Sequence, residues 1–117
     1  MSGTILHLAL ASEWESATAR GSYGTSTLGV SIEEEGYLHA CEDRAQLDGV
    51  AQRYYADVDA PLVVLSISEQ ALTAAGLTVR RERPAPGADL FPHVYGGPLP
   101  VSTVVDVSPF ERGVAGV

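Results

Sequence analysis

Hydrophobic and polar residues alternate over short stretches of the chain, and this pattern predicts several β-strands. In residues 4–10, Leu6 and Leu8 fall on one face of the predicted strand and His7 falls on the other. The apolar run at residues 62–67, in which Ser66 is the one polar residue, predicts an interior strand that is covered on both faces. Further strands are predicted at residues 36–41, 77–82, 90–95 and 101–107.

A helical repeat is clearest at residues 43–56, where Asp43 can cap the helix and apolar side chains recur on one face. That predicted buried face comprises Leu47, Val50, Ala51, Tyr54 and Tyr55. Two shorter helices are predicted, one at residues 13–20 behind a Ser12 cap and one that begins after Ser68 and ends at Gly76. The segments 22–31 and 83–89 are rich in glycine, serine, threonine or proline, which predicts loops.

Strands along the whole chain and short helices predict one α+β domain over residues 1–117. We expect a mixed, mostly antiparallel sheet of about five to seven strands with about two to three short helices. The chain is 45% hydrophobic and long enough to build a core without disulfides or metals. The expected ordered core covers residues 4–109, and residues 111–117 are expected to form a loose tail.

The chain is acidic, with a formal net charge of −8, and its seven basic residues are all arginine. With this charge balance, we expect the chain to bind neither nucleic acids nor anionic membrane surfaces. No apolar run approaches the roughly 18 residues that span a membrane, and the first residues lack the basic segment of a signal peptide. The single cysteine, Cys41, excludes an intrachain disulfide, so we expect a protein of the reduced cytoplasm.

The three histidines of the chain all fall in predicted strands. Histidine is the side chain best suited to exchange protons near neutral pH, so these residues are the first candidates for chemistry. His7 alone is more typical of a satisfied core residue. No His-x-His or His-Glu-x-x-His spacing occurs, and no metal site is predicted.

His39 lies in the segment Glu35-Gly36-Tyr37-Leu38-His39-Ala40-Cys41. If the strand already includes Glu35, this carboxylate shares a face with His39 and can orient its imidazole. Tyr37 and Cys41 lie on that face as well. Cys41 is expected to be an inert buried thiol, and a nucleophile beside His39 is the alternative. The structural alternative for His39 itself is a hydrogen-bonded residue of a half-buried strand.

His93 shares a predicted strand face with Phe91 and Tyr95, and a Gly96-Gly97 turn follows. Aromatic walls beside one polar group suit an aromatic or nucleoside-like ligand. The alternative is a core strand whose histidine and tyrosine reach its edge. Nearby, the basic cluster of Arg80, Arg81 and Arg83 predicts either a charged edge strand or a clamp for an anionic group.

Several motifs together resemble one small bacterial family, the domain of unknown function 952. The matching segments are Ile5-Leu6-His7-Leu8, Trp14, Gly21-x-Tyr23, Glu35-Gly36-Tyr37-Leu38-His39, Gln46, Glu82 and Phe91-Pro92-His93-Val94-Tyr95-Gly96. The resemblance covers about residues 4–109. The fold of this family is similar to that of ADP-ribosyltransferases, and residues 37–41 of the chain resemble a strand of the tRNA 2′-phosphotransferases.

The resemblance implies that His7 and His39 face a shared cleft, with His93 opposite or at its rim, and it implies NAD as a candidate cofactor. The acidic chain has no matching pair of arginines beside His39, and Glu82 is only a candidate for the acidic residue that orients the ribose. Two hypotheses follow. One is an enzyme with His39, His93 and Glu35 as catalytic residues and His7, Tyr37, Cys41, Glu82, Phe91 and Tyr95 as ligand-binding residues, which performs acid–base or ADP-ribosyl or phosphoryl transfer chemistry. The other is a non-catalytic small-molecule-binding module or partner adaptor.

Overall fold

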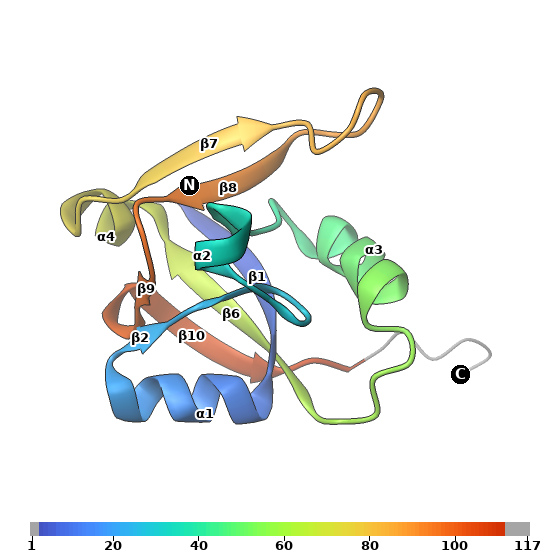
Figure 1. The fold of residues 1–117 in the computed structure, drawn as a ribbon, viewed down its shortest axis with the longest axis horizontal. Helices are drawn as coiled ribbons and strands as arrows, with labels where there is room; N and C mark the ends of the chain where they lie inside the picture. Colours follow the sequence, from blue (N-terminus) through green and yellow to red (C-terminus); the bar gives the residue numbers. More distant parts are fainter. Residues whose placement is uncertain (1–2, 112–117) are drawn as a thin grey trace.

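The predicted apolar strand lies in the centre of a three-stranded sheet. The computed structural model describes residues 3–111. Strand β6 (Leu62–Ser68) lies between β1 (Thr4–Leu10) and β10 (Val104–Pro109), and both pairs are antiparallel (Figure 1). Four of the seven residues of β6 are buried, on both of its faces, which confirms the predicted interior position.

A second antiparallel sheet carries the two histidine segments. Strand β8 (Phe91–Tyr95) lies between β5 (Leu38–His39) and β7 (Thr78–Glu82). His39 is directly opposite His93, and Leu38 is opposite Val94. Because directly opposed residues point to the same side of a sheet, the two histidines share one face and the two buried aliphatic residues share the other.

The remaining strands form two small antiparallel pairs, so the β-structure is divided rather than continuous. Strand β2 (Ser22–Tyr23) pairs with β9 (Leu99–Pro100), and β3 (Thr25–Thr27) pairs with β4 (Val30–Ser31). The expectation of a loop over residues 22–31 was therefore wrong. The described residues hold four small sheets instead of one sheet of five to seven strands. The two three-stranded sheets approach each other at the isolated bridge between Leu6 and Cys41, which is too short to join them into one sheet.

Four α-helices occur in residues 3–111, more than the sequence predicted: α1 (Ala11–Arg20), α2 (Ile32–Glu35), α3 (Arg44–Tyr54) and α4 (Glu69–Ala74). The predicted caps of two are confirmed. Asp43 accepts a hydrogen bond from the Gln46 amide at 2.9 Å, and Ser68 accepts one from the Ala71 amide at 3.1 Å. The predicted Ser12 cap is wrong, because α1 begins at Ala11 directly after β1.

Helix α2 was missed, although its start has a clear local cause. The Ser31 hydroxyl accepts from the Glu34 amide at 3.0 Å, and the Glu34 carboxylate accepts from the Ser31 amide at 3.0 Å. This reciprocal capping box folds the acidic run into one helical turn. Gly36 ends the helix with φ of 95°, a left-handed conformation that favours glycine. The strand that follows is consequently much shorter than predicted, and Glu35 is not part of it.

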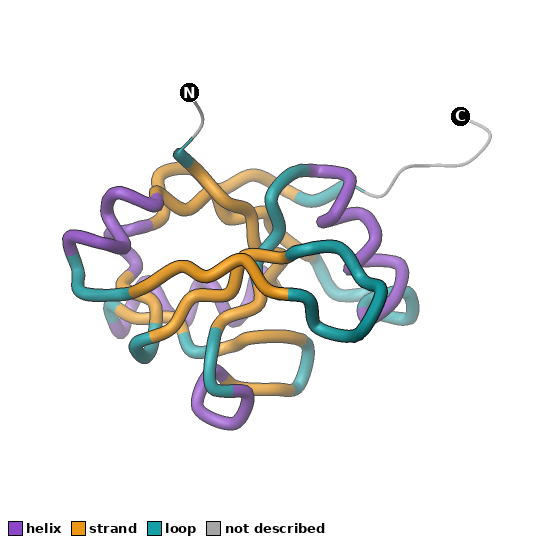
Figure 2. Tube along the Cα trace, turned by 90° about the horizontal axis from the view of Figure 1, so that it is seen from above, coloured by secondary structure: helices purple, strands orange, loops and turns teal. Residues whose placement is uncertain are grey.

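Two groups of buried apolar residues pack around the central strands. One contains Ile5, Leu65 and Ile67, and the other contains Leu8 together with the inner face of α3. Leu47, Val50, Ala51 and Tyr55 are buried as predicted, whereas Tyr54 is 47% exposed. Figure 2 shows the helices at the periphery, around strands that occupy the middle of the molecule.

The end of the described chain differs slightly from the prediction. A 3₁₀ turn (Val101–Thr103) precedes β10, so the final strand begins and ends later than residues 101–107. Within residues 3–111, no helix is both long and apolar enough to cross a membrane. The expected loose tail at residues 111–117 lies almost wholly outside the described residues.

Candidate functional site

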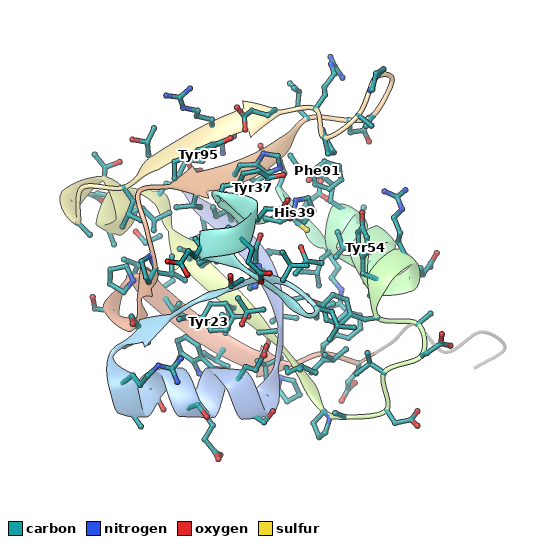
Figure 3. The ribbon with its side chains drawn as sticks, viewed as in Figure 1. Tyr23, Tyr37, His39, Tyr54, Phe91 and Tyr95 are labelled. Atoms are coloured by element: carbon teal, nitrogen blue, oxygen red, sulfur yellow. The ribbon has the colours of Figure 1, made fainter. Side chains whose placement is uncertain are left out.

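A pocket of about 410 Å³ lies between helix α3 and the histidine-bearing strands. Aromatic and charged side chains from both sides line it. Figure 3 labels four of the lining residues, Tyr37, His39, Tyr54 and Phe91. Tyr37, His39 and Phe91 come from the β5–β8 side, and Gln46, Arg53 and Tyr54 come from α3. The pocket therefore depends on two parts of the chain that are distant from each other in the sequence.

His39 is the one imidazole that lines this pocket. Its backbone is held on both sides: the amide donates to Ser26 Oγ at 3.1 Å, and the carbonyl oxygen lies 2.7 Å from His7 Nδ1. Burial, together with the nearby His93, His7 and Arg53, lowers the pKa of His39 to about 4. The ring is therefore neutral at pH 7 and can accept a proton or a hydrogen bond. In the described part of the chain no protein group is hydrogen-bonded to its ring nitrogens.

His7 lies behind His39 rather than in the pocket, where the family resemblance had placed it. Its side chain is 2% exposed. Because Nδ1 faces a carbonyl oxygen, it must carry the proton, and Nε2 then accepts a hydrogen bond from the Tyr23 hydroxyl at 3.1 Å. Burial lowers the pKa of His7 to about 4, consistent with this neutral form. His7 thus positions the backbone of His39.

His93 lies on the same sheet face as His39 but is covered. Its side chain is 2% exposed, and the Tyr37 ring stacks on it with 4.0 Å between centroids and 17° between planes. His93 Nδ1 is 2.8 Å from Glu82 Oε1, and the Tyr95 hydroxyl donates to the same oxygen at 2.6 Å. These two hydrogen bonds lower the pKa of Glu82, and the bond to Glu82 raises the pKa of Tyr95 to about 12.

The other candidates from the sequence divide between the pocket and its surroundings. Glu35, at the end of α2, lines the pocket, but it makes no hydrogen bond to His39. Tyr95 packs behind Tyr37, with ring centroids 5.5 Å apart, and does not line the pocket. Cys41 is 2% exposed and packs with the core beside α3, where burial raises its thiol pKa to about 12. That environment makes it a poor nucleophile.

Sequence reasoning missed the contribution of α3 to the pocket. The sequence pattern placed Tyr54 on the buried face of α3, yet Tyr54 is the exposed last residue of this helix and lines the pocket. Arg53 makes neither an ion pair nor a hydrogen bond with the described residues, which is also true of Arg80, but Arg53 lines the pocket. Its guanidinium carbon lies 6.0 Å from the centre of the adjacent Tyr54 ring. An arginine next to an exposed aromatic residue in a helix was the signal that could have marked this wall.

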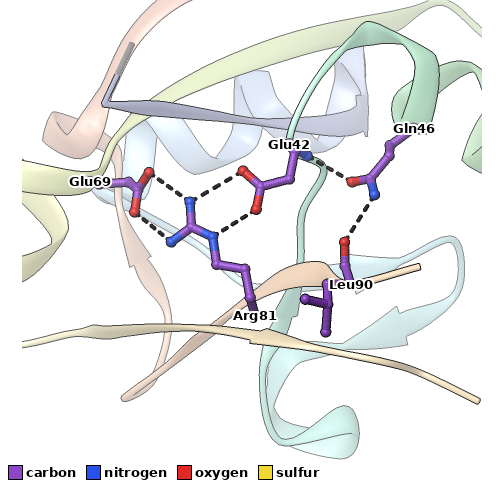
Figure 4. Close-up of polar contacts among 5 residues, drawn as sticks. All are labelled: Glu42, Gln46, Glu69, Arg81 and Leu90. Atoms are coloured by element: carbon purple, nitrogen blue, oxygen red, sulfur yellow. Dashed lines mark hydrogen bonds and ion pairs between the residues drawn. The ribbon is translucent and has the colours of Figure 1, made fainter. Parts of the chain in front are cut away.

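The basic cluster of β7 does not act as one clamp. Arg81 is bound by two carboxylates, with four hydrogen bonds of 2.7–3.2 Å to Glu42 and Glu69 (Figure 4). Arg80 lies over the Tyr95 ring at 5.3 Å, and Arg83 donates to the Ala88 carbonyl at 2.7 Å. The three arginines therefore have separate partners within the protein, which is the behaviour expected of a charged edge strand.

Gln46 connects the pocket to this charged network. Its Oε1 atom accepts from the Glu42 amide at 2.9 Å, and its Nε2 donates to the Leu90 carbonyl at 2.9 Å (Figure 4). The side chain thereby joins the start of α3 to the segment that enters β8. In residues 3–111, no group of three or more histidine, cysteine or carboxylate side chains is placed to hold a metal ion.

Comparison with known proteins identifies a family and a fold. A family model described as "Protein of unknown function (DUF952)" matches residues 8–107. The crystal structure of protein CC0527 from Caulobacter crescentus is similar, with a TM-score of 0.73 and 24% identity over 97% of this chain and 91% of that one. The solution NMR structure of CC0527 is similar as well, with a TM-score of 0.72 and 24% identity over 97% of this chain and 90% of that one. No curated protein matches the chain.

Proposed function

The chain belongs to the DUF952 family, and we propose that its pocket binds a small, flat, nucleotide-like molecule and uses His39 as a proton acceptor. The observation that carries this proposal is the state of His39: a neutral imidazole with free ring nitrogens, held in place through its backbone at the edge of a small-molecule-sized pocket. Side chains with shifted pKa values in a cleft are typical of functional sites.

The walls of the pocket favour a planar ligand. Tyr37 and Phe91 stand on the sheet side and Tyr54 on the helix side, so a ring can pack against aromatic surfaces from two directions. A volume of about 410 Å³ is in the range of ordinary small-molecule sites. The same surfaces would accept a nicotinamide or adenine ring equally well.

Arg53 supplies the reason to expect an anionic group on that ligand. A guanidinium without a protein acceptor can form two parallel hydrogen bonds to a phosphate or carboxylate. Glu35 and Asp89 also line the pocket, so an anion is favoured close to Arg53 and disfavoured elsewhere. A nucleotide monophosphate therefore fits these charges better than a highly charged polyphosphate.

The finer assignment that we propose is an ADP-ribosyltransferase-like fold with NAD as the first ligand to test, and a cytoplasmic location. Support for the fold assignment comes from the resemblance of residues 37–41 to the phosphotransferase strand. The buried free thiol of Cys41 suits a reducing compartment. In this version His39 would hold the nicotinamide ribose, and transfer from NAD would be the reaction.

Ligand titrations followed by NMR, with NAD, AMP and nicotinamide as probes, test the proposal. We expect saturable shifts of pocket residues with AMP and NAD, and a loss of about tenfold or more in affinity for AMP in Arg53→Ala, because a charge-assisted contact is removed. Arg44→Ala is the matched control: Arg44 is on the same helix but pairs with Asp48 at 2.8 Å. Absence of saturable shifts at millimolar concentrations of all three probes would contradict the proposal.

One observation favours the second candidate, a non-catalytic binding module. Only one of the three imidazoles is open to the pocket, while His7 and His93 are both 2% exposed. Acid–base catalysis commonly uses two groups. If ligand binding survives His39→Ala and the parent protein shows no detectable turnover of the ligand, the protein is a binding module. If His39→Ala still binds the ligand but loses the turnover that the parent protein shows, the protein is an enzyme.

A further inference from the structure

We propose that Glu82 and His93 form a second proton-accepting pair, covered by Tyr37, which joins His39 in the pocket when the Tyr37 side chain turns away. The proposal goes beyond ligand binding in the pocket, because it assigns chemistry to two residues that do not line it. It rests on three observations: the contacts of Glu82, the buried Nε2 atom of His93, and the position of Tyr37.

The contacts of Glu82 fix the orientation of His93. The carboxylate oxygen that faces His93 Nδ1 at 2.8 Å also accepts from the Tyr95 hydroxyl at 2.6 Å. Nδ1 must donate to this carboxylate, so in the neutral ring the lone pair is on Nε2. A carboxylate that orients an imidazole in this way, and that stabilises it once it is protonated, is the usual support of a histidine base.

The Nε2 atom of His93 is buried and has no hydrogen-bond partner among the described residues. Buried polar side-chain atoms nearly always find a partner, because an unpaired one costs stability. This atom is the one such case in the described part of the chain. The rings that contact His93 are those of Tyr37, at 4.0 Å, and His39, at 5.4 Å between centroids. His39 lies directly opposite His93 in the sheet and lines the pocket, so the pocket is the space next to the His93 ring.

Tyr37 covers one face of the His93 ring. Its ring is partly exposed, lines the pocket and stacks on His93, and no hydrogen bond ties its hydroxyl to the described residues. Gly36, with φ of 95° and no atom within 4 Å of an added Cβ, precedes it, and the two-residue strand β5 begins after it. A rotation about χ1 of Tyr37 is opposed by its ring contacts with His93 and Tyr95 and by no hydrogen bond, and it would open one face of the His93 ring to the pocket that His39 lines.

The proton step is simple. A ligand O–H or N–H bond breaks as its proton forms a bond to Nε2 of His93, and the imidazolium is stabilised by the Glu82 carboxylate. The proton then passes from Nε2 to a leaving group of the ligand or to water, which restores the neutral ring. With His39 beside it, the pocket would hold two imidazoles, one bonded to a carboxylate and one not, and two such groups can serve as the acid and the base of a reaction.

Modification of histidines by diethyl pyrocarbonate, with each site quantified by peptide mass spectrometry, tests this without any ligand. In the parent protein we expect fast modification of His39, slow modification of His93 and none of His7, which is buried behind the backbone. Tyr37→Ala should raise the rate at His93 by about tenfold or more, since the covering ring is gone. Tyr37→Phe should leave that rate within about twofold, because the stack remains.

Two outcomes would overturn the proposal. If His93 stays unmodified in both the parent protein and Tyr37→Ala, Nε2 is not reachable from the pocket. If His93 reacts equally fast in both proteins, Tyr37 is not its cover. His7 reports on folding, and if it becomes reactive in Tyr37→Ala, Tyr37→Leu replaces that variant and is judged by the same two criteria. Because no ligand is used, failure here is separate from a failure of ligand binding at the pocket.

Discussion

The Nδ1 atom of His7 lies 2.7 Å from the carbonyl oxygen of His39, so a buried histidine holds the backbone of the pocket histidine. The other ring nitrogen of His7 is bonded to the Tyr23 hydroxyl at 3.1 Å. Three strands, β1, β2 and β5, are thereby tied together at a single imidazole. The position of the pocket side chain therefore depends on a residue that does not line the pocket.

Replacement of His7 should therefore be strongly destabilising. His7→Leu leaves the His39 carbonyl and the Tyr23 hydroxyl without partners in the core, and we expect a loss of about 2–5 kcal/mol in the free energy of unfolding. Urea denaturation of both proteins measures it. In the double variant with Tyr23→Phe the loss should be smaller than the sum of the two single losses, because the residues share one hydrogen bond. Additive losses would show that the bond contributes little.

Stability should fall as the pH is lowered from about 6.5 to about 4. The pKa of His7 is lowered to about 4 in the folded protein, against about 6.5 in an unfolded chain, so over this range the unfolded state binds more protons. The contribution of neutral His7 is fully present above pH 6.5 and is lost progressively down to pH 4, at most about 3 kcal/mol. The pKa of His39 is also lowered to about 4, so its protonation reduces stability over the same pH range.

Urea midpoints across this pH range measure the effect. The slope of stability against pH should be smaller in His7→Leu than in the parent protein, whatever the absolute loss of stability. Below about pH 4.5, protonation of Glu69 and Glu82 adds a further loss, because their pKa values are lowered in the fold by Arg81 and by Tyr95 respectively. An unchanged slope between pH 4 and 6.5 in the variant would show that His7 titrates normally in the folded state.

Arg81 should contribute modestly and in a salt-dependent way. It joins Glu42, ahead of α3, to Glu69, at the start of α4, through four hydrogen bonds. Because the three side chains are still 28–36% exposed, we expect Arg81→Ala to cost about 1 kcal/mol at low salt and less at 1 M salt. The exposed pair of Arg44 and Asp48 is the control, and Arg44→Ala should cost no more than about 0.5 kcal/mol.

Two glycines should respond in opposite directions to alanine. Gly49 lies within α3, with open space around an added Cβ, so Gly49→Ala should stabilise the protein by about 0.5–1 kcal/mol. Gly96 has φ of 125°, and its added Cβ would lie 3.4 Å from Leu77, so Gly96→Ala should destabilise by about 1–3 kcal/mol. Thermal melts of both variants provide the test, and a gain in stability at Gly96 would contradict the assigned turn.

The site was predicted from the sequence only in part. Alternation in β8 correctly placed His93 on the face of Phe91 and Tyr95, because strand periodicity is a local property. The same reasoning predicted a strand at residues 36–41 and left open whether it includes Glu35, whereas the capping box of Ser31 and Glu34 makes Glu35 the last residue of a helix. A competing local signal of hydrogen-bonded caps was present in the sequence and was overlooked.

The sequence by itself determined the elements whose causes are local: strand β1, the interior strand β6, and the caps at Asp43 and Ser68. Only the tertiary structure decided which histidine is open. His39 and His93 come to the same face through the register of β5 and β8, and Tyr37 then covers one of them. Burial of this kind depends on packing between segments distant in the chain, and periodicity within a segment carries no information about it.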